Sequence, residues 1–407
     1  MGSARRRRRR ARWRGLVARS LGVSLGALLA LLVIVGLQIP LMGRGPSVVV
    51  TAPSVPPTSA PALAWPTVGS AAIDVPSLGV LEGYHSAVAP IASLTKLMTA
   101  YVALKKWPLR LGQSGPCTVV NTQDVATFTA MVAIDESSVV VVPGERLCEF
   151  DLLDGLLVHS AGNYAVILAD MIAGSSGAYV ALMNRTAAAL GLTGTSYHDV
   201  TGYSSASVST ALDQARLAVL LMKSPLIRFI VDQTSVTLPV AGVVGSFTPD
   251  VGSDNVVGVK SGRTFQAGGC DVMAVLFHEG ATTKTVYSVV LGQRGGNLLA
   301  PAGAAALALA NSAISGVRHV TFAAHTTVAD IVWGGRRVNV GPTASEGVWW
   351  WPTGGRVTLV VHLRHLTSSI RRGEAIGQLI VSGATRRGIA LRAFANLAPP
   401  TLLERLR

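Results

Sequence analysis

The sequence has few cysteines, few charged residues and no histidine cluster, and each shortage excludes a class of protein. Its 407 residues include three cysteines, Cys117, Cys148 and Cys270, which are too few and too far apart for a zinc cage or a small disulfide scaffold. Only 14% of the residues are charged and 49% are hydrophobic, so most of the chain is not disordered and can bury a sizeable core. The eight histidines show no metal-ligand spacing. We therefore expect no metal and no cofactor.

Acidic residues are also scarce, and their distribution decides what the positive charge means. Basic residues outnumber acidic ones by 35 to 21, a net charge of +14 that first suggests a nucleic-acid partner. However, residues 20–316 carry 14 basic and 17 acidic residues, whereas residues 1–19 carry nine arginines and no acid. Residues 317–407 carry 12 basic and 4 acidic residues. We therefore expect no nucleic-acid partner, and a basic surface near the C-terminus that suits anionic wall polymers or lipid headgroups.

A long apolar run without charge follows the arginines. Residues 21–42 as a helix would rise about 1.5 Å per residue and span a ~30 Å hydrocarbon core. The positive-inside rule keeps residues 1–20 in the cytoplasm as a basic arm and sends the rest of the chain across. We expect a single-pass signal anchor in the cell membrane with the folded part outside the cytoplasm. A cleaved secretory signal is the alternative, because both begin with a basic and then an apolar region.

Three further regions follow. Residues 45–67 are rich in Pro, Ser, Ala and Thr, which predicts an extended linker. Residues 68–316 alternate strand and helix patterns and predict an α+β domain with an antiparallel sheet, and residues 317–407 predict a small β-rich domain. The expected strands are 71–75, 256–259, 272–277, 286–291, 357–363, 376–381 and 388–394, and the expected helices are 94–106, 152–159, 164–172, 210–222 and 300–314. Thr210 and Asp213 have the spacing of a capping box at one helix start.

Lysine is the scarce cation, since the chain has 29 Arg and 6 Lys. Lysine can lose its proton when it is desolvated or lies beside another cation, whereas arginine effectively cannot. Lys96 lies three residues after Ser93 at the start of an expected helix, which puts the amine and the hydroxyl on one face. A neutral Lys96 could take the proton of Ser93 as the serine attacks a carbonyl. Alone, the pattern is more typical of a capping serine followed by a solvated lysine.

Two other polar groups suit the same chemistry. Residues 260–262, Lys-Ser-Gly, follow an expected strand, where a cation and a hydroxyl could hold a carboxylate while the glycine lets a substrate lie close. Lys260 would also help to lower the pKa of Lys96. Residues 160–163, Ser-Ala-Gly-Asn, join two expected helices and could add a second hydroxyl. In isolation, an exposed edge-strand lysine explains residues 260–262 at least as well, and an ordinary turn between helices explains residues 160–163 better.

Together and in this order, the three groups resemble the motifs of the serine D-alanyl-D-alanine carboxypeptidases, low-molecular-mass penicillin-binding proteins that belong with the serine β-lactamases. The resemblance covers residues 71–314, and it implies a β-lactamase/transpeptidase-like α+β core of an antiparallel sheet with helices, often followed by a β-rich domain. It rests on residues 91–100 (IASLTKLMTA), 151–153 (DLL) leading to Ser160, 260–262 (KSG) and 267–269 (AGG), with 199–202 (DVTG) and 209–211 (STA) similar to connecting segments.

The resemblance implies a serine peptidase mechanism. Ser93 would be the acylated nucleophile, Lys96 its base, and Ser160 would pass a proton toward the leaving D-alanine. The substrate would be the D-Ala-D-Ala end of peptidoglycan stem peptides outside the membrane, and β-lactams would acylate the same serine. Carboxypeptidase and endopeptidase activity both remain open, because they differ in groove shape rather than in motif residues.

The third motif would hold the substrate. By the same resemblance, Lys260 and Ser261 would bind the terminal carboxylate beside Gly262, and the backbone N–H groups of Ser93 and Arg263 would form the oxyanion hole. Threonine is commoner in the family where this chain has Ser261, which keeps the hydroxyl.

The second motif departs more seriously from the family. The family's Ser-x-Asn is Ser160-Ala161-Gly162 here, and Asn163 falls one residue late. Either Asn163 reaches the substrate through a local change of the turn, or the site lacks that contact. Losing one transition-state contact lowers the rate by about 10²- to 10³-fold. A weakly active or inactive peptidoglycan-binding pseudoenzyme is therefore an alternative.

Three features outside the main motifs carry smaller expectations. A β-lactamase needs an acidic deacylation base, and Asp135 and Glu136 precede Ser160 rather than lying in the later loop where that base is expected. The exported location permits a disulfide between Cys117 and Cys148, with Cys270 a buried thiol. Of the consecutive residues Trp349–Trp351, at least one must point inward on a strand, which predicts partial core packing rather than purely glycan or lipid contact.

Overall fold

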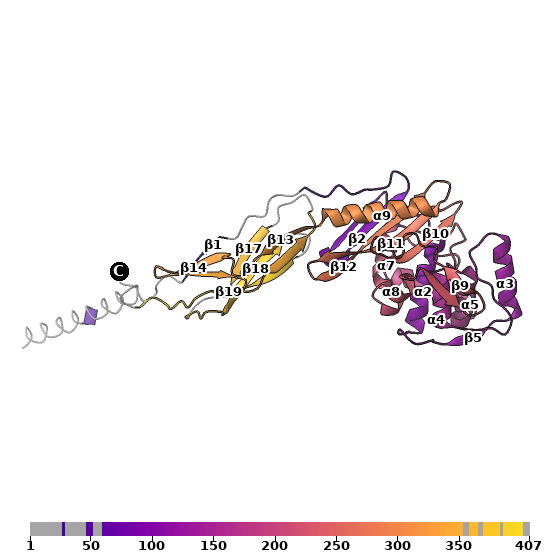
Figure 1. The fold of residues 1–407 in the computed structure, drawn as a ribbon, viewed down its shortest axis with the longest axis horizontal. Helices are drawn as coiled ribbons and strands as arrows, with labels where there is room; N and C mark the ends of the chain where they lie inside the picture. The colour runs from indigo at the N-terminus through magenta and orange to yellow at the C-terminus, as the bar shows by residue number, and fades with distance from the viewer. Residues whose placement is uncertain are drawn as a thin grey trace, which may run out of the picture.

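The structure is a computed structural model of the chain, and it describes residues 27–28, 46–51, 59–352, 358–364, 369–382 and 386–401. The expected basic arm and, apart from residues 27–28, the expected anchor lie outside the described residues. An α+β domain and a β-rich domain lie end to end in an elongated arrangement (Figure 1). One described helix, α9 (Leu299–Gly316), is long and apolar enough to span a membrane, but it packs along the sheet of the α+β domain.

The centre of the α+β domain is a five-stranded antiparallel sheet of order β10-β11-β12-β2-β3. The strands are β2 (Ser70–Val75), β3 (Val80–Tyr84), β10 (Val256–Thr264), β11 (Gly268–Glu279) and β12 (Thr282–Gln293). All four expected strands of this domain are confirmed, and each is longer than expected. Alternate side chains serve two cores: Met273 and Val275 pack under α9, whereas Val272 and Ala274 pack with the helices of the other face. The expected α+β core is confirmed.

Helices cover the second face of the sheet and carry the cleft. The expected helices are confirmed, and α3, α6 and α8 add to them. Besides α9, the helices of this domain are, in chain order, η1 (Pro76–Leu78), η2 (Ala92–Leu94), α2 (Thr95–Lys106), α3 (Thr122–Ala133), α4 (Glu149–Leu157), α5 (Gly162–Ala173), α6 (Ser176–Ala189), α7 (Ala211–Leu221) and α8 (Pro225–Val231). Two-stranded ribbons join β4 (Ala89–Pro90) to β7 (Val208–Ser209), β5 (Cys117–Val119) to β6 (Arg146–Cys148), and β8 (Ser235–Leu238) to β9 (Gly242–Gly245). Helix α2 is buried along most of its length, which fixes Lys96 at its start.

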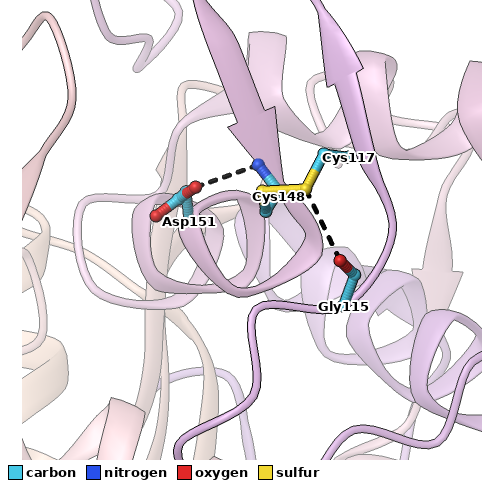
Figure 2. Close-up of a disulfide and its surroundings, with 4 residues drawn as sticks. All are labelled: Gly115, Cys117, Cys148 and Asp151. Carbon is cyan, nitrogen blue, oxygen red and sulfur yellow. Dashed lines mark hydrogen bonds between the residues drawn. A yellow bond between two sulfur atoms is a disulfide. The ribbon is translucent and has the colours of Figure 1, made fainter.

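The disulfide between Cys117 and Cys148 is confirmed. The two cysteines lie opposite each other in the β5–β6 ribbon (Figure 2). The Asp151 carboxylate accepts a hydrogen bond of 2.9 Å from the Cys148 backbone N–H, which caps α4. The disulfide thus fixes the start of the helix that leads to Ser160. Cys270 is a buried free thiol, as expected.

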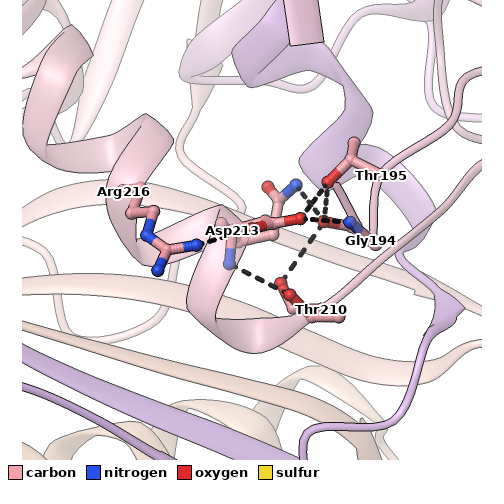
Figure 3. A network of polar contacts seen from close by, with 7 residues as sticks. Gly194, Thr195, Thr210, Asp213 and Arg216 are labelled. Atoms are coloured by element: carbon pink, nitrogen blue, oxygen red, sulfur yellow. Dashed lines mark hydrogen bonds and ion pairs between the residues drawn. The ribbon is translucent and has the colours of Figure 1, made fainter. Parts of the chain in front are cut away.

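The predicted capping box at α7 forms only in part. The Thr210 hydroxyl accepts a hydrogen bond of 3.1 Å from the Asp213 N–H. The Asp213 carboxylate does not return to the cap, because it accepts hydrogen bonds of 2.9 Å from the Gly194 N–H and the Thr195 hydroxyl and pairs with Arg216 at 3.1 Å (Figure 3). Asp213 therefore fastens the loop at Gly194 to α7.

The β-rich domain contains a strand from the N-terminal side of the chain. Its six-stranded sheet has the order β1-β14-β15-β19-β18-β17, with β1 (Ser47–Val50), β14 (Ala329–Trp333), β15 (Arg336–Gly341), β17 (Thr358–Leu363), β18 (Ala375–Ser382) and β19 (Arg386–Ala393). A separate ribbon joins β13 (Arg318–Phe322) to β16 (Glu346–Trp350). The interpretation of residues 45–67 as a linker throughout is wrong for β1, which pairs antiparallel with β14. Three consecutive valines favour a strand, and the free edge of β14 supplies its partner.

The tryptophans connect the two domains. Trp350 and Trp351 are buried, and Trp349 stacks on His319, so the expected partial core packing is confirmed. The Trp351 ring N–H donates a hydrogen bond of 2.9 Å to the Glu82 carboxylate, and its ring packs into the core under α9. Trp351 therefore ties the β-rich domain to β3 of the α+β domain.

Candidate active site

The structure brings the three motifs together at one cleft. Helix α2 contributes Lys96, the α4–α5 connection contributes Ser160, and β10 contributes residues 260–263. A cavity of about 90 Å³ is lined by Ser93, Ser160, Ser261, Gly262 and Arg263 among others, and an adjoining cleft of about 460 Å³ also includes Ser93 and Arg263.

Ser93 and Lys96 are in direct contact. The Lys96 amine donates a hydrogen bond of 3.0 Å to the Ser93 hydroxyl oxygen and one of 2.8 Å to the Thr201 carbonyl. Lys96 is only 1% exposed. Burial lowers its pKa to about 8, although the negative charges of Glu136 and Asp199 oppose that shift. A fraction of Lys96 is therefore neutral near pH 7 and can accept the Ser93 proton.

The segment at residues 199–202 holds this pair in place. The Asp199 carboxylate accepts hydrogen bonds from the Thr201 hydroxyl and the Gly202 N–H, both 2.8 Å, and from the Ser207 hydroxyl. This turns the Thr201 carbonyl toward Lys96. Gly202 has a φ of +84°, and a side chain there would overlap the Ala92 carbonyl oxygen. The sequence marked this segment only as a connection, whereas the structure gives it a positioning role.

Ser160 presents an unpartnered hydroxyl to the cleft. Its φ of +62° is unusual for a serine and costs on the order of 1 to 3 kcal/mol. Backbone hydrogen bonds on its C-terminal side hold the turn, from Ala161 N–H to Gly155 O and from Gly162 N–H to Ser137 O. The Ser160 oxygen is shielded from solvent and has no hydrogen-bond partner within the described residues. It is therefore available to an incoming ligand.

The β10 motif places two further polar groups. Lys260 is fully buried, and its amine donates a hydrogen bond of 2.7 Å to the Ser261 carbonyl. Burial, together with the Lys96 charge, lowers the pKa of Lys260 well below its usual value, while the buried carboxylate of Asp271 opposes the shift. The Ser261 hydroxyl donates to the Phe247 carbonyl at 2.7 Å, so it must rotate to donate to a ligand.

Gly262 and Arg263 shape the wall and the mouth of the cleft. A Cβ on Gly262 would lie 2.5 Å from the Ser93 backbone nitrogen. We expected the glycine to let a substrate lie close to β10, but the atoms that lie close to Gly262 belong to Ser93. The Arg263 side chain is 54% exposed and lies 4.0 Å from the Asp135 carboxylate at the mouth of the cleft.

Of the two alternatives left open for Asn163, the structure supports the second, in which the site lacks a contact from this side chain. Asn163 is fully buried, its amide oxygen accepts a hydrogen bond of 3.0 Å from the Val139 N–H, and its amide nitrogen donates one of 2.8 Å to the Val139 carbonyl. Both polar atoms are therefore used by the backbone of a segment 24 residues earlier. A one-residue shift on a helix turns the side chain by about 100°, away from the cleft.

Other polar side chains near the cleft have structural partners. The His159 ring stacks on Phe247, and its Nδ1 lies 2.8 Å from the Gly245 carbonyl, which is a packing role. Within the described ranges, no group of three or more His, Cys, Asp or Glu side chains is arranged to hold a metal ion. From the sequence, Asp199 was only part of a connecting segment and Glu136 was misplaced for a deacylation base. Asp271 was not named, since an isolated acidic residue carries no spacing signal.

Comparisons with known proteins agree with this architecture. The family model for D-alanyl-D-alanine carboxypeptidase matches residues 71–295. The chain is 37% identical over 136 residues to D-alanyl-D-alanine carboxypeptidase DacC of Escherichia coli (32% of this chain, 33% of that protein). It is 36% identical over 140 residues to the D-alanyl-D-alanine endopeptidase of Pseudomonas aeruginosa (34% of this chain, 42% of that protein). The chain thus matches well under half the length of these curated relatives.

Solved structures share the fold over more of the chain. Penicillin binding protein 5 of Haemophilus influenzae is 18% identical with a TM-score of 0.57, covering 85% of this chain and 100% of that one. The peptidoglycan synthesis regulatory factor PBP3 of Streptococcus pneumoniae is 18% identical with a TM-score of 0.60, covering 83% of this chain and 100% of that one. At this identity the likeness concerns the fold, an α+β core followed by a β-rich domain.

Proposed function

Because the chain belongs to the D-alanyl-D-alanine carboxypeptidase family of serine peptidases, we propose that it cleaves the D-Ala-D-Ala end of peptidoglycan stem peptides through an acyl-enzyme at Ser93. The observation that carries the proposal is the 3.0 Å contact between the Ser93 hydroxyl and the buried amine of Lys96. A lysine whose pKa is lowered to about 8 can act as a base near neutral pH, which a solvated lysine cannot.

The proposed mechanism uses the groups that line the cleft and the Lys96 amine beside them. Ser93 Oγ attacks the carbonyl carbon of the penultimate D-alanine, and its proton goes to Lys96 Nζ. The C–N bond then breaks, and Ser160 passes a proton from Lys96 to the leaving amine of D-alanine. Water hydrolyses the ester and regenerates Ser93, so that two easier steps replace one difficult step.

The β10 residues bind and polarise the substrate in this proposal. Lys260 and Ser261 provide hydrogen-bond donors for the terminal carboxylate, and the guanidinium of Arg263 provides positive charge. The backbone N–H groups of Ser93 and Arg263 receive the developing oxyanion. The closeness of Gly262 to Ser93 supports this role, because it lets β10 lie directly against the nucleophile.

The proposal includes the membrane location. Residues 21–42 would be a single-pass anchor, with the catalytic domain on the extracytoplasmic side, where stem peptides are found. The support is the uncharged length of that segment and the nine arginines before it. β-Lactams would act as inhibitors by acylating Ser93.

A fluorescent penicillin and a D-alanine release assay test the proposal. The full chain in detergent should form a covalent adduct and release D-alanine from a pentapeptide, and Ser93→Ala should do neither. Ser137→Ala, which changes a cleft serine without a lysine contact, should keep the adduct. An adduct that persists in Ser93→Ala, or no adduct in the wild type, would contradict the proposal.

A binding role without turnover is the second candidate. It is favoured by one observation, the engagement of both Asn163 amide atoms with Val139, which leaves the cleft without the motif amide. An adduct without D-alanine release would support this candidate.

A further inference from the structure

Gly162 stands where the second motif of the family has asparagine, and the structure shows what fills the space. Its φ lies outside the left-handed region, so the backbone does not require glycine. Space does, because a Cβ on Gly162 would lie 2.7 Å from Glu136 Oε1 and 3.1 Å from the Ser137 carbonyl oxygen. The Glu136 carboxylate therefore occupies the place into which an asparagine side chain would extend.

The backbone around Glu136 is held on both sides. The Glu136 N–H donates a hydrogen bond of 2.9 Å to the Met131 carbonyl, and the Gly162 N–H donates one of 2.7 Å to the Ser137 carbonyl. Val139, three residues after Glu136, is bound through its backbone by both amide atoms of Asn163. Asn163 thus fixes the segment that carries Glu136 instead of binding substrate.

The Glu136 carboxylate lies in the catalytic cleft with an unused acceptor. Its Oε1 is shielded from solvent and has no hydrogen-bond partner among the described residues, and Glu136 and Ser93 line the same cleft of about 460 Å³. A shielded carboxylate oxygen without a partner is unfavourable unless a cation compensates it. Lys96 is a cation on which Glu136 acts, because the Glu136 charge raises the pKa of Lys96 against the effect of burial.

We propose that Glu136 replaces the motif asparagine as a positioning residue for acylation, and that its carboxylate stabilises the ammonium of Lys96 that forms when Ser93 gives up its proton. This inference rests on the proposed function. In that step the Ser93 O–H bond breaks, the proton moves to Lys96 Nζ, and the Ser93 oxygen bonds to the carbonyl carbon. Glu136 exchanges no proton in this step.

The other charged groups that face Lys96 do not take this role. Lys260, on β10, has the wrong sign and opposes the ammonium. Asp199, in the segment before β7, contributes negative charge, but its oxygens accept hydrogen bonds from Thr201, Gly202, Tyr203 and Ser207, among others. Of the two carboxylates that favour the Lys96 ammonium, Glu136 is the one with an oxygen that has no hydrogen-bond partner among the described residues.

The scarcity of lysine allows a direct measurement. Full-length protein in detergent micelles, labelled with ¹³C at the lysine ε carbon, has six lysines, and Lys96→Arg assigns the Lys96 signal by its loss. The wild-type signal should titrate near pH 8. In Glu136→Gln the midpoint should fall by about one pH unit, because the carboxylate that favours the ammonium is gone.

Two variants act as controls. Asp135→Asn removes the same charge from the neighbouring residue, whose side chain is 95% exposed, and should leave the Lys96 midpoint unchanged because solvent screens that charge. Glu136→Asp keeps the charge, so it should shift the Lys96 midpoint by less than about half as much as Glu136→Gln does. A wild-type midpoint in Glu136→Gln, or an equal shift in Asp135→Asn, would overturn the inference.

A double variant tests the replacement of asparagine. Gly162→Asn alone should reduce penicillin acylation at least tenfold, because the new side chain meets the Glu136 carboxylate. In Glu136→Ala/Gly162→Asn that loss should be largely recovered relative to Gly162→Asn. Equal losses in the single and double variants would contradict the inference that Glu136 occupies the space of an asparagine side chain at position 162. The lysine titration needs no acylation, so its result separates failure of this inference from failure of the proposed function.

Discussion

At the scale of single residues, the chemistry of the cleft depends on how burial and charge act on Lys96. The amine is almost fully enclosed, which favours the neutral base, while two carboxylates favour the ammonium. The resulting pKa of about 8 leaves both states accessible. The residue can therefore accept a proton in acylation and return it to the leaving group.

This balance predicts the pH dependence of acylation. Only neutral Lys96 accepts the Ser93 proton, so the rate of penicillin acylation should rise with pH and level off above about pH 8. Lys96→Arg keeps the charge but cannot become neutral, and it should lower the rate by about 10²- to 10⁴-fold at every pH. Stopped-flow labelling from pH 6 to 9 measures both effects. A flat wild-type profile would argue against Lys96 as the base.

A second buried carboxylate, Glu149, gives a prediction about stability. Glu149 is fully enclosed, neither oxygen has a hydrogen-bond partner within the described residues, and burial raises its pKa from 4.5 to about 7. The folded state therefore holds this proton more tightly than the unfolded state. Ionising Glu149 destabilises the fold fully above about pH 7 and not at all below pH 4.5.

Glu149→Gln should remove that penalty. Its free energy of unfolding should exceed the wild-type value by about 1 to 3 kcal/mol at pH 8, and the difference should vanish near pH 4.5. Urea unfolding at the two pH values measures it. Glu145→Gln is the matched control, because Glu145 accepts hydrogen bonds from the Val142 and Val240 N–H groups and its replacement should bring no gain. A gain that is independent of pH would exclude the charge as the cause.

Residue contacts within one turn of helix were predictable from the sequence, whereas contacts between distant segments were not. The spacing of Ser93 and Lys96 predicted that the two side chains meet, and they lie 3.0 Å apart, because residues three positions apart lie on the same face of a helix. The orientation of Asn163 depends on Val139, and the need for glycine at 162 depends on Glu136. Neither of these two contacts produces a pattern in the neighbouring sequence, so the sequence could not predict them.

At the scale of elements, periodicity located the helices that form the core but missed others. Helices α2, α5 and α9 have apolar side chains over most of their surface and were expected. Helix α3 fully buries only Asp124 and Met131, while Val125 and Phe128 pack partly buried against the core, and its start carries a full capping box at Asn121 and Asp124. That capping box was the signal that could have located α3.

The β5–β6 ribbon gives a prediction at this scale. The Cys117–Cys148 disulfide closes a loop of 31 residues, so the double variant Cys117→Ser/Cys148→Ser should lose about 3 to 4 kcal/mol of unfolding free energy in the chain-entropy account. Urea unfolding monitored by penicillin labelling measures the loss. Reduction of the wild type with dithiothreitol should produce the same midpoint as the double variant. An unchanged midpoint in both would show that the ribbon does not depend on the bond.

At the scale of the whole molecule, the chain passes from one end of the β-rich domain into the α+β domain and returns. β1 lies in the same sheet as strands more than 280 residues later, as its pairing of Ser47 with Val332 shows (Figure 1). The composition of residues 45–67 did not reveal this, because a four-residue edge strand is held by its partner's backbone rather than by buried side chains. In the proposed topology, only residues 43–46 separate the anchor from β1, a reach of about 14 Å, so the β-rich domain would lie next to the membrane.

The charge of that domain then predicts membrane affinity. Residues 317–407 carry 12 basic and 4 acidic residues, and Arg336, Arg337, Arg371 and Arg372 are exposed. A chain that begins at residue 46 should bind vesicles with 30% anionic lipid in 50 mM salt and bind at least tenfold less in 500 mM salt. Flotation assays measure this, with neutral vesicles as the control. Binding that is independent of salt would point to apolar contacts instead.

The position of β1 gives the last prediction, because its removal leaves the edge of β14 without a partner. A chain that begins at residue 59 should be about 2 kcal/mol less stable in its β-rich domain than one that begins at residue 46, since the ladder of Ser47–Val50 is lost. Thr51→Pro in the longer chain removes the N–H that donates to the Val328 carbonyl at 2.9 Å and should reproduce part of this loss, whereas Thr51→Ala should not. Exposed strand edges pair with one another, so the shorter chain should also self-associate in sedimentation velocity as its concentration rises. Equal melting curves and equal sedimentation for the two chains would mean that the β-rich domain is complete without β1.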